Sequence, residues 1–420
     1  MMKNFVVKGD FVQSETSDRL FCLENAYLVC VDGKSKGVFS TLPEAYENLP
    51  LVDYSGKLLL CGLVDVHLHA PQYTFAGMGM DLELLDWLNT YTFPEEGNYG
   101  KVDYAKKAYD IFVKDLKNSP TTRFSAFATM HQEATDYLMG QLEGAGLSGL
   151  VGLVSMNRNA PDFLSQKNPV VSLHTWLETS QKYQNIKPIL TPRFIPSCED
   201  GLMEEIGEIQ KKTKLPLQSH LSENLGEIQW VKELVSGVET YGHAYEKFGC
   251  FGTNGKTIMA HCVHSSPSEI ALMKKNGVTV AHCPQSNSNL SSGIAPIRTY
   301  LEEGIAVGLG SDVAGGHSLS LFQQMVEAIQ VSKLRWRLVD DTLPPLTVPE
   351  AYYLATRGGG SFFGKVGALE EGYDFDLIVL EEKETVKELT LENRLERVIY
   401  LGGTLKEKYV QGRKIALDLT

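Results

Sequence analysis

The sequence predicts an α/β protein: a (β/α)8 barrel with a small β-sandwich domain built from both chain ends. Three observations predict it. Short apolar runs alternate with amphipathic segments over about 300 residues, polar motifs stand where those runs end, and β-patterned pieces occupy both ends of the chain. A (β/α)8 barrel takes roughly 250 residues and carries its active site at the carboxyl ends of its strands.

Eight runs have the length and the aliphatic content of buried strands. They lie near residues 61–69, 122–130, 147–156, 186–194, 215–221, 256–263, 277–283 and 305–313. Helical periodicity fills the intervals, for example from Tyr104 to Lys117 and from Leu319 to Leu334. We therefore expect the barrel domain to span residues 61–365.

The remaining residues, 1–60 and 366–420, are expected to form one composite β-sandwich domain. Their β-patterned pieces are Phe5–Lys8, Ala26–Val31, Asp376–Leu380 and Arg397–Leu401, separated by turn signals such as Asp32-Gly-Lys. Neither end could make a stable sheet alone, so the two ends are expected to pair beside the barrel.

Composition and charge narrow the possible partners. The 420 residues are 43% hydrophobic and 22% charged, as in an ordinary globular protein. A net charge of -13 and a pI of about 5.3 argue against nucleic acid or an anionic membrane as partner. No apolar stretch approaches the roughly 20 residues that span a bilayer, and the first residues lack a signal-peptide pattern. We expect a cytoplasmic protein.

Seven cysteines are scattered and never form Cys-x-x-Cys. This pattern is typical of free thiols in a reducing compartment rather than of disulfides or a thiolate zinc site. Any metal is therefore expected to be held by nitrogen and oxygen.

His67 and His69 end the first barrel strand, in the run Cys61–Gln72. Alternate residues of a strand share a face, so the two imidazoles meet at the strand tip and suit a divalent metal. The alternative for such a pair alone is two hydrogen-bonded core histidines. Other strands end in polar groups as well: His220 and Glu223, His261 and His264, His282, and Asp312. Five strand ends thus point at one mouth.

The order His-x-His, then His, His and Asp on later strands resembles the amidohydrolase superfamily. The segments His69–Gln72, Trp87–Pro94, Pro192–Phe194, His220–Glu223 and Gly310–Asp312 resemble its guanine deaminase family, and the likeness covers nearly the whole chain. Cys61 departs from the superfamily's usual proline, at a position that touches no ligand. The resemblance implies His67, His69, His220 and Asp312 as ligands of one divalent metal, with water completing the shell.

Chemistry supports that ligand set. Three neutral imidazoles and one carboxylate leave the ion with positive charge and an open position, so bound water can ionise near neutral pH. Zinc suits these donors and ferrous iron accepts them too, so the metal stays open. Structural hydrogen bonding is the alternative for His220 and for Asp312. The fourth strand ends in Thr191-Pro-Arg-Phe, without the modified lysine of binuclear relatives, which favours a single metal.

Glu223 follows His220 by three residues and is expected to be the proton shuttle, which requires a pKa raised by burial. Its alternative is a helix-capping glutamate. His261 could be a further metal ligand, but the resemblance suggests that it contacts the water and, with Asp312, stabilises the developing alkoxide. Its other alternative is a core histidine. His264 and His282 receive no role.

Recognition of a flat base is expected from an arginine, an amide and aromatic rings. Arg193 could donate to O6 and N7 of guanine, Phe194 could stack, and Gln72 could bind the pyrimidine edge. A surface salt bridge is the alternative for Arg193. The segment Leu82–Pro94 is expected to close the mouth, or else to pack in the core. The expected substrate contacts are His69, Gln72, Trp87, Arg193, Phe194, His220, Glu223 and Asp312.

The resemblance implies that the reaction is hydrolysis of guanine to xanthine and ammonia, in purine catabolism. It also implies a homodimer, the commonest symmetric assembly. One alternative is the same chemistry on another amino-heterocycle, of the thioadenosine, adenosylhomocysteine, 8-oxoguanine or triazine type. The other is a catalytically silent scaffold. The motifs of zinc deaminases that act on nucleic acids are absent, which disfavours a polynucleotide substrate.

Overall fold

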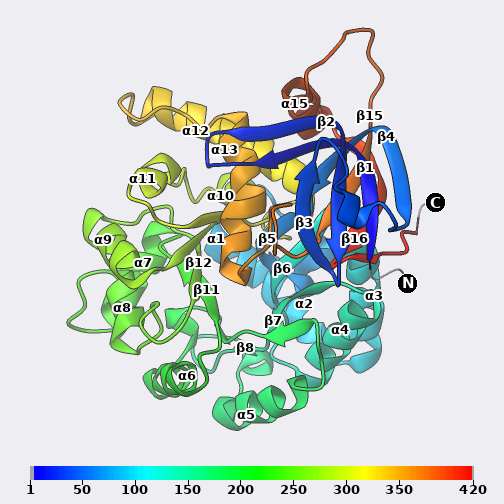
Figure 1. Cartoon of the computed structure of the whole chain (residues 1–420). Coiled ribbons are helices and arrows are strands. Elements are labelled where there is room, and N and C mark those ends of the chain that lie inside the picture. The colour runs from blue at the N-terminus through cyan, green and yellow to red at the C-terminus, as the bar shows by residue number, and fades with distance from the viewer. Residues whose placement is uncertain (1–3, 419–420) are drawn as a thin grey trace.

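The computed structural model describes residues 4–418. A barrel of parallel strands wrapped by helices stands beside a small β-domain, and both chain ends emerge on the β-domain side (Figure 1). The predicted barrel with a composite β-domain is confirmed.

All eight predicted barrel strands are present, and two of them are interrupted. They are β5 (Leu63–His69), β6 (Thr121–Phe127), β7 (Ser148–Gly152) with β8 (Val154–Ser155), β9 (Ile186–Pro188) with β10 (Thr191–Pro192), β11 (Leu217–Leu221), β12 (Thr257–His261), β13 (Thr279–His282) and β14 (Val307–Leu309). They form two parallel four-stranded sheets, β5-β6-β7-β9 and β11-β12-β13-β14, and β8 pairs with β10 in a separate two-stranded parallel sheet. A bridge from Leu190 to Leu217 joins the sheets on one side, and the Asp312 N–H donates to the His67 carbonyl on the other. The barrel is thereby closed.

Helices surround the barrel because each carries one apolar face. In α3 (Val102–Asn118) the buried residues recur every three or four positions, from Ala105 through Tyr109 and Phe112 to Leu116. The predictions around 104–117 and 319–334 correspond to α3 and α12 (Leu321–Leu338) and are confirmed. The other helices on the barrel side are α1 (Leu84–Trp87), α2 (Phe93–Asn98), α4 (Gln132–Gly144), α5 (Pro169–Ser180), α6 (Asp200–Thr213), α7 (Leu225–Leu234), α8 (Tyr241–Lys247), α9 (Pro267–Asn276), α10 (Pro284–Asn289), α11 (Ile297–Glu302), α13 (Val348–Tyr353) and α14 (Gly359–Phe363).

The barrel interior is a packed core and not a channel. Its apolar lining comes from β5, β12, β13 and neighbouring segments: Val64, Val66, Ile189, Ile258, Ala260, Ala281 and Cys283. Phe362 and Val366 pack into the same cluster, and Lys256, which directly precedes β12, donates to the Phe362 carbonyl. This end of the barrel is therefore filled, which leaves the carboxyl ends of the strands for a binding site.

The β-domain combines strands from both chain ends in one sheet. Its order is β17 (Arg413–Lys414), β16 (Gly403–Val410), β15 (Leu377–Glu382), β4 (Leu51–Cys61), β1 (Asn4–Ser14), β2 (Leu20–Val31) and β3 (Lys34–Phe39). In a flat sheet β1 and β16 would lie about 14 Å apart, three strand spacings. The rings of Phe5 on β1 and Tyr409 on β16 are nevertheless 5.6 Å apart. The sheet therefore coils back on itself, and its two halves enclose a core as in a sandwich.

One predicted strand is wrong. Arg397–Leu401 lies inside the helix α15 (Leu391–Leu401). Its Val-Ile-Tyr-Leu run has high β-propensity, but Leu391, Leu395, Val398 and Ile399 together form one buried helical face. Thr390 caps the first turn by accepting a hydrogen bond from the Asn393 N–H. Packing of this stripe outweighs local propensity.

Buried charged side chains fix the β-domain to the barrel. Lys408 of β16 is fully buried, and its Nζ donates to the carbonyls of Leu116, Lys117 and Ser119 at the end of α3, at 3.0 to 3.2 Å. Arg123 of β6 pairs with Asp374 at 2.7 Å and with Asp376 at 3.1 Å. The domain limits at residues 60/61 and 365/366 stay predictions.

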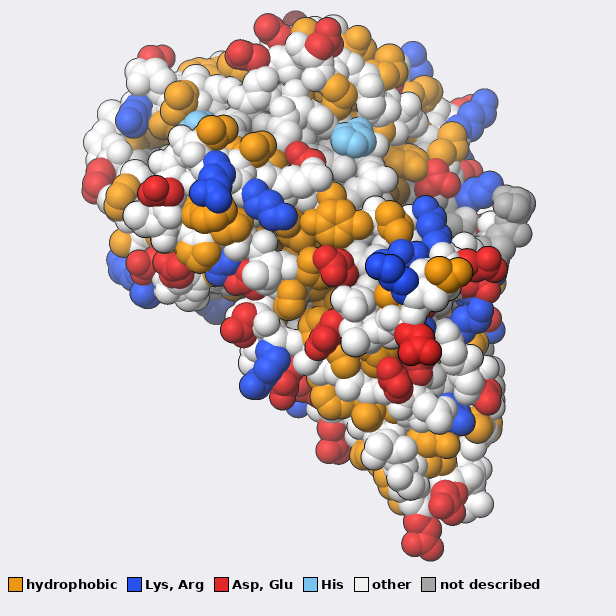
Figure 2. Space-filling model, turned by 90° about the horizontal axis from the view of Figure 1, so that it is seen from above, with side chains coloured by type: hydrophobic (Ala, Val, Ile, Leu, Met, Phe, Trp, Pro, Cys, Tyr) orange, Lys and Arg blue, Asp and Glu red, His pale blue; other side chains and the backbone are white. Residues whose placement is uncertain are grey.

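Charged and apolar side chains are mixed on the surface of the protein. Acidic and basic side chains are interspersed with apolar ones on the face seen in Figure 2. Within residues 4–418, no helix combines the length and the apolar character that crossing a membrane requires.

Candidate active site

A pocket opens at the carboxyl ends of the barrel strands, where barrel enzymes bind their substrates. All eight residues expected to contact the substrate line it, together with His261, Glu227, Leu84, Leu88 and Leu290. The barrel thus brings together residues that are up to 243 positions apart, from His69 to Asp312.

The four predicted metal ligands lie together: His69, His220 and Asp312 line this pocket, and the buried His67 contacts Asp312. His67 Nε2 and His69 Nε2 lie 3.1 Å and 3.5 Å from Asp312 Oδ1. His69 Nε2 is also 3.1 Å from His220 Nε2. Ligands held about 2.1 Å from one tetrahedral ion lie ~3.4 Å from each other, so these separations fit a single metal ion.

The hydrogen bonds of this cluster also fit a cation. His220 Nδ1 lies 2.6 Å from the Arg193 carbonyl, which can only accept, so Nδ1 carries the proton and Nε2 keeps its lone pair for the centre. His67 is fully buried, and within residues 4–418 neither of its ring nitrogens makes a well-aligned hydrogen bond, although Nε2 lies 3.1 Å from Asp312 Oδ1. Buried polar atoms rarely lack a partner, and a metal ion would supply one here.

Electrostatics keep the donors in the form that a metal requires. Burial lowers the pKa of His67, and burial with neighbouring histidines holds the pKa of His69 and His220 well below the usual range. Burial opposes ionisation of Asp312, but His67, His261 and His69 outweigh it and hold the pKa of Asp312 below its ordinary value. The imidazoles are therefore neutral and the carboxylate is charged.

The backbone at this end of the barrel is unusual. Ser222, His261, Cys262 and Asp312 all have positive φ, between 46° and 71°. Residues with side chains rarely adopt this region, and strained conformations of this kind cost about 1–3 kcal/mol each and gather at functional sites. The strain occurs where the strands turn to present His261 and Asp312 to the pocket.

Glu223 lines the same pocket as the cluster and lies beside His261. It is 4% exposed, and burial raises its pKa to about 7. One carboxylate oxygen accepts from the Ser292 hydroxyl at 3.1 Å, and the other lies 3.4 Å from His261 Nε2. Glu223 is not the residue that caps the following helix, because Asn224 and Glu227 form the capping box of α7.

His261 faces both carboxylates. Its Nε2 lies 3.7 Å from Asp312 Oδ2 as well as 3.4 Å from Glu223 Oε2. Burial disfavours the charged ring, but these carboxylates outweigh it and raise the pKa of His261. Its Nδ1 is 2.9 Å from Asn287 Oδ1, so Asn287 orients the ring. Neither Asn287 nor Ser292 stands out in the sequence, because each acts through a contact that only folding creates.

Gln72 and Arg193 meet at a carboxylate that sequence reasoning missed. Glu96, in α2, accepts from Gln72 Nε2 at 2.9 Å and from Arg193 Nη1 at 2.5 Å. Arg193 is 3% exposed and its guanidinium also lies 5.3 Å from the centre of the Phe93 ring. It is therefore not a surface arginine. A Pro-Glu-Glu run, the only local signal for Glu96, is ordinary for a first helical turn.

Some residues of the segment Leu82–Pro94 line the pocket and others pack in the core, so each of the two predicted alternatives applies to part of the segment. Trp87, with Leu84 and Leu88, lines the pocket, while Trp87 Nε1 donates to the Met78 carbonyl. Phe93 instead belongs to a buried cluster with Phe127. Phe194, from the end of the fourth strand, is 8% exposed and also lines the pocket.

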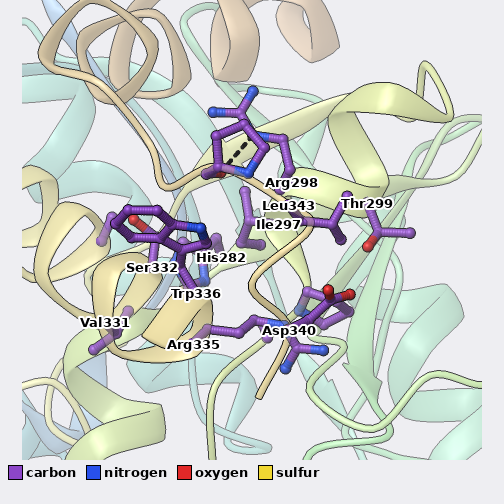
Figure 3. A pocket seen from close by; sticks show the side chains of 14 residues that line it. His282, Ile297, Arg298, Thr299, Val331, Ser332, Arg335, Trp336, Asp340 and Leu343 are labelled. Carbon is purple, nitrogen blue, oxygen red and sulfur yellow. Dashed lines mark hydrogen bonds between the residues drawn. The ribbon is translucent and has the colours of Figure 1, made fainter. Parts of the chain in front are cut away.

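The remaining motif histidines lie away from the pocket. His264 Nε2 is 2.7 Å from the Ser292 carbonyl. His282 is buried and lines a separate small cavity between β13, α11 and α12, near Arg335 and Trp336 (Figure 3). Within residues 4–418, neither ring makes a hydrogen bond to the His and Asp cluster, and the roles of both histidines stay open.

Comparison with known proteins places the chain in a family. The model of the amidohydrolase family matches residues 58–406, so the chain belongs to the amidohydrolase family. Within that family it is similar to guanine deaminases. It is 36% identical to guanine deaminase of Dictyostelium discoideum over 88% of this chain and 85% of that protein. It is 37% identical to the Rattus norvegicus enzyme over 86% and 83%.

A solved structure gives the same result. A guanine deaminase from C. acetobutylicum, crystallised with guanine bound in its active site, superposes with a TM-score of 0.96. It is 45% identical, and the match covers 98% of this chain and all of that one. E. coli guanine deaminase matches with a TM-score of 0.90 at 28% identity, over 99% of this chain and 100% of that one.

Proposed function

We propose that this protein is a guanine deaminase, which hydrolyses guanine to xanthine and ammonia. A bond forms between the water oxygen and C2 of the base, the bond from C2 to the exocyclic nitrogen breaks, and ammonia leaves. The observation that carries the proposal is one pocket in which a His and Asp cluster, a buried glutamate, and an amide and guanidinium pair face the same space. The 45% identity with the guanine-bound enzyme supports the same substrate.

His67, His69, His220 and Asp312 are the proposed ligands of one divalent metal. Zinc is the proposed ion, since imidazole and carboxylate donors suit it, and iron is the alternative. When bound, such an ion lowers the pKa of water and so supplies a nucleophile at neutral pH. What supports the ligand set is the spacing of the donors and the unsatisfied ring of His67.

Glu223 is the proposed proton shuttle. As a carboxylate it accepts a proton from the attacking water, and as a carboxylic acid it passes that proton to a ring nitrogen. It then accepts the second proton, from the hydroxyl now on C2, and passes it to the leaving amine. A pKa near 7 suits both tasks at neutral pH. His261 is proposed to donate from Nε2 to the oxygen that gains negative charge at C2, while Asn287 holds its other nitrogen.

Guanine is proposed to bind with its pyrimidine edge toward Gln72 and Arg193, between Trp87 and Phe194. The ring then has C2 near the cluster and its O6 near the guanidinium, where a planar donor group suits a carbonyl oxygen. His69, His220, Glu223 and Asp312 complete the contacts on the reacting side. We also propose a cytoplasmic homodimer that acts in purine catabolism.

The proposed activity is tested by supplying guanine to the metal-analysed protein and measuring ammonia and xanthine together. We expect equal amounts of both products, and loss of both after the metal is removed by a chelator. A panel with 5'-deoxyadenosine, 8-oxoguanine and an aminotriazine is the control. Release of ammonia from a panel member but not from guanine would assign the site to that other ring.

A further inference from the structure

Glu96 connects the two residues that are proposed to read the substrate. Its carboxylate is 2% exposed, and each oxygen has one partner: Oε1 accepts from Gln72 and Oε2 accepts from Arg193. Both partners line the pocket, whereas Glu96 lies behind them and does not. A buried carboxylate in this position controls how the two side chains face the pocket.

The polarity of Gln72 follows from chemistry alone. A carboxylate can only accept hydrogen bonds, so the Gln72 end that faces Glu96 must be the NH2 group. The Gln72 carbonyl oxygen accepts no hydrogen bond within residues 4–418, and it is therefore available to the pocket as an acceptor. A glutamine without such a partner could present either end.

Arg193 is fixed in the opposite sense. A guanidinium can only donate, and Glu96 occupies Nη1 while Phe93 lies 5.3 Å from the guanidinium carbon. The described chain makes no hydrogen bond to Nη2 or Nε, so these donors remain for a ligand. The pocket wall thus offers one acceptor and one donor side by side.

We propose that Glu96 is a positioning residue that sets this pattern and thereby selects rings with an N–H next to a carbonyl. This inference rests on the proposed deamination of guanine, whose N1–H and O6 form such a pair. A purine whose N1 is a bare acceptor and whose C6 carries only hydrogen places an acceptor against the Gln72 oxygen. Such a ring is rejected because two acceptors meet without a proton between them.

The test compares guanine with 2-aminopurine, which has the same 2-amino group but lacks both N1–H and O6. In the variant Glu96→Gln, the new side chain has one donor end and one acceptor end. If its oxygen faces Arg193, its NH2 group faces Gln72, so Gln72 must turn its oxygen toward residue 96 and its NH2 group toward the pocket. We expect kcat/KM for guanine to fall ~10- to 100-fold and inhibition by 2-aminopurine to become tighter.

A loss of activity on guanine together with tighter inhibition by 2-aminopurine distinguishes a positioning role from general damage to the pocket. General damage would weaken the interaction with both ligands. Glu350→Gln is the matched control, because Glu350 is another buried carboxylate paired with an arginine, Arg298, at 2.6 Å and 2.8 Å, away from the pocket. The control substitution should leave kcat/KM for guanine unchanged relative to the strength of inhibition by 2-aminopurine. If Glu96→Gln does not fold, Glu96→Asp keeps the charge but shortens the reach, and a smaller change of the same sign is expected.

The outcomes separate the two proposals. The role of Glu96 would be overturned if the wild-type protein deaminates guanine and the folded Glu96 variant keeps the wild-type preference for guanine over 2-aminopurine. This preference is kcat/KM for guanine compared with the strength of inhibition by 2-aminopurine. A parallel loss for both ligands would overturn the role of Glu96 as well. No guanine deamination by the metal-loaded wild-type protein would instead overturn the proposed function.

Discussion

Replacing Glu223 by glutamine removes the group proposed to move the proton while changing little else. The glutamine is isosteric, and its oxygen can still accept from the Ser292 hydroxyl, now at 3.1 Å from Glu223. General acid–base catalysis contributes about 10²- to 10⁴-fold, which corresponds to roughly 3–5 kcal/mol at 1.36 kcal/mol per tenfold. Glu223 acts in two successive transfers, so we expect a loss in kcat toward the upper end of this range.

The pH profile gives an independent measure of the same residue. Burial raises the pKa of Glu223 to about 7, and only the ionised form can accept a proton from water. Wild-type kcat/KM is therefore expected to fall as pH decreases below about 7, and the variant should lose this acid limb.

The assay is ammonia release from guanine between pH 5.5 and 9, with metal analysis of both proteins. Metal content should be equal, because Glu223 is not among the proposed ligands. Undiminished turnover in Glu223→Gln, or an acid limb that persists in it, would refute the assignment.

Three further predictions follow from named contacts. Metal-free Glu223→Gln should be more stable than wild type by up to about 3 kcal/mol above pH 7, with no advantage below pH 4.5. In the folded wild type Glu223 keeps its proton up to about pH 7, whereas the unfolded chain releases it near pH 4.5. The free energy of unfolding of the wild type therefore decreases as the pH rises from about 4.5 to about 7. Equal melting temperatures of the two proteins at pH 8 would contradict this prediction. Asn287→Ala should lower kcat about 10- to 100-fold with KM little changed, because His261 loses its orienting acceptor; a change in KM alone would point to substrate binding instead. Lys408→Met should lower the free energy of unfolding by about 2–4 kcal/mol, since three carbonyls at the end of α3 lose their donor; denaturant melts measure it, and an unaltered midpoint would show that these bonds contribute nothing net.

The sequence by itself determined the barrel and the floor of the site. Strand periodicity and the spacing of His67 and His69 are local properties, and parallel strands of a barrel necessarily gather their carboxyl ends at one face. For that reason His220, His261 and Asp312 could be assigned to the same mouth although the chain separates them widely. All eight barrel strands needed no more than boundary adjustments of a few residues or a short interruption.

Only the tertiary structure decided which residues support the side chains of the pocket from behind. Glu96 meets Gln72 and Arg193 across 24 and 97 positions, and Ser292 meets Glu223 across 69, through contacts that leave no periodic trace in the chain. The same cause explains α15, where burial of one helical stripe outweighed the β-propensity of Val398 and its neighbours. Local patterns fix which face a side chain occupies on its own element, whereas partners from distant elements depend on packing that the whole fold settles at once.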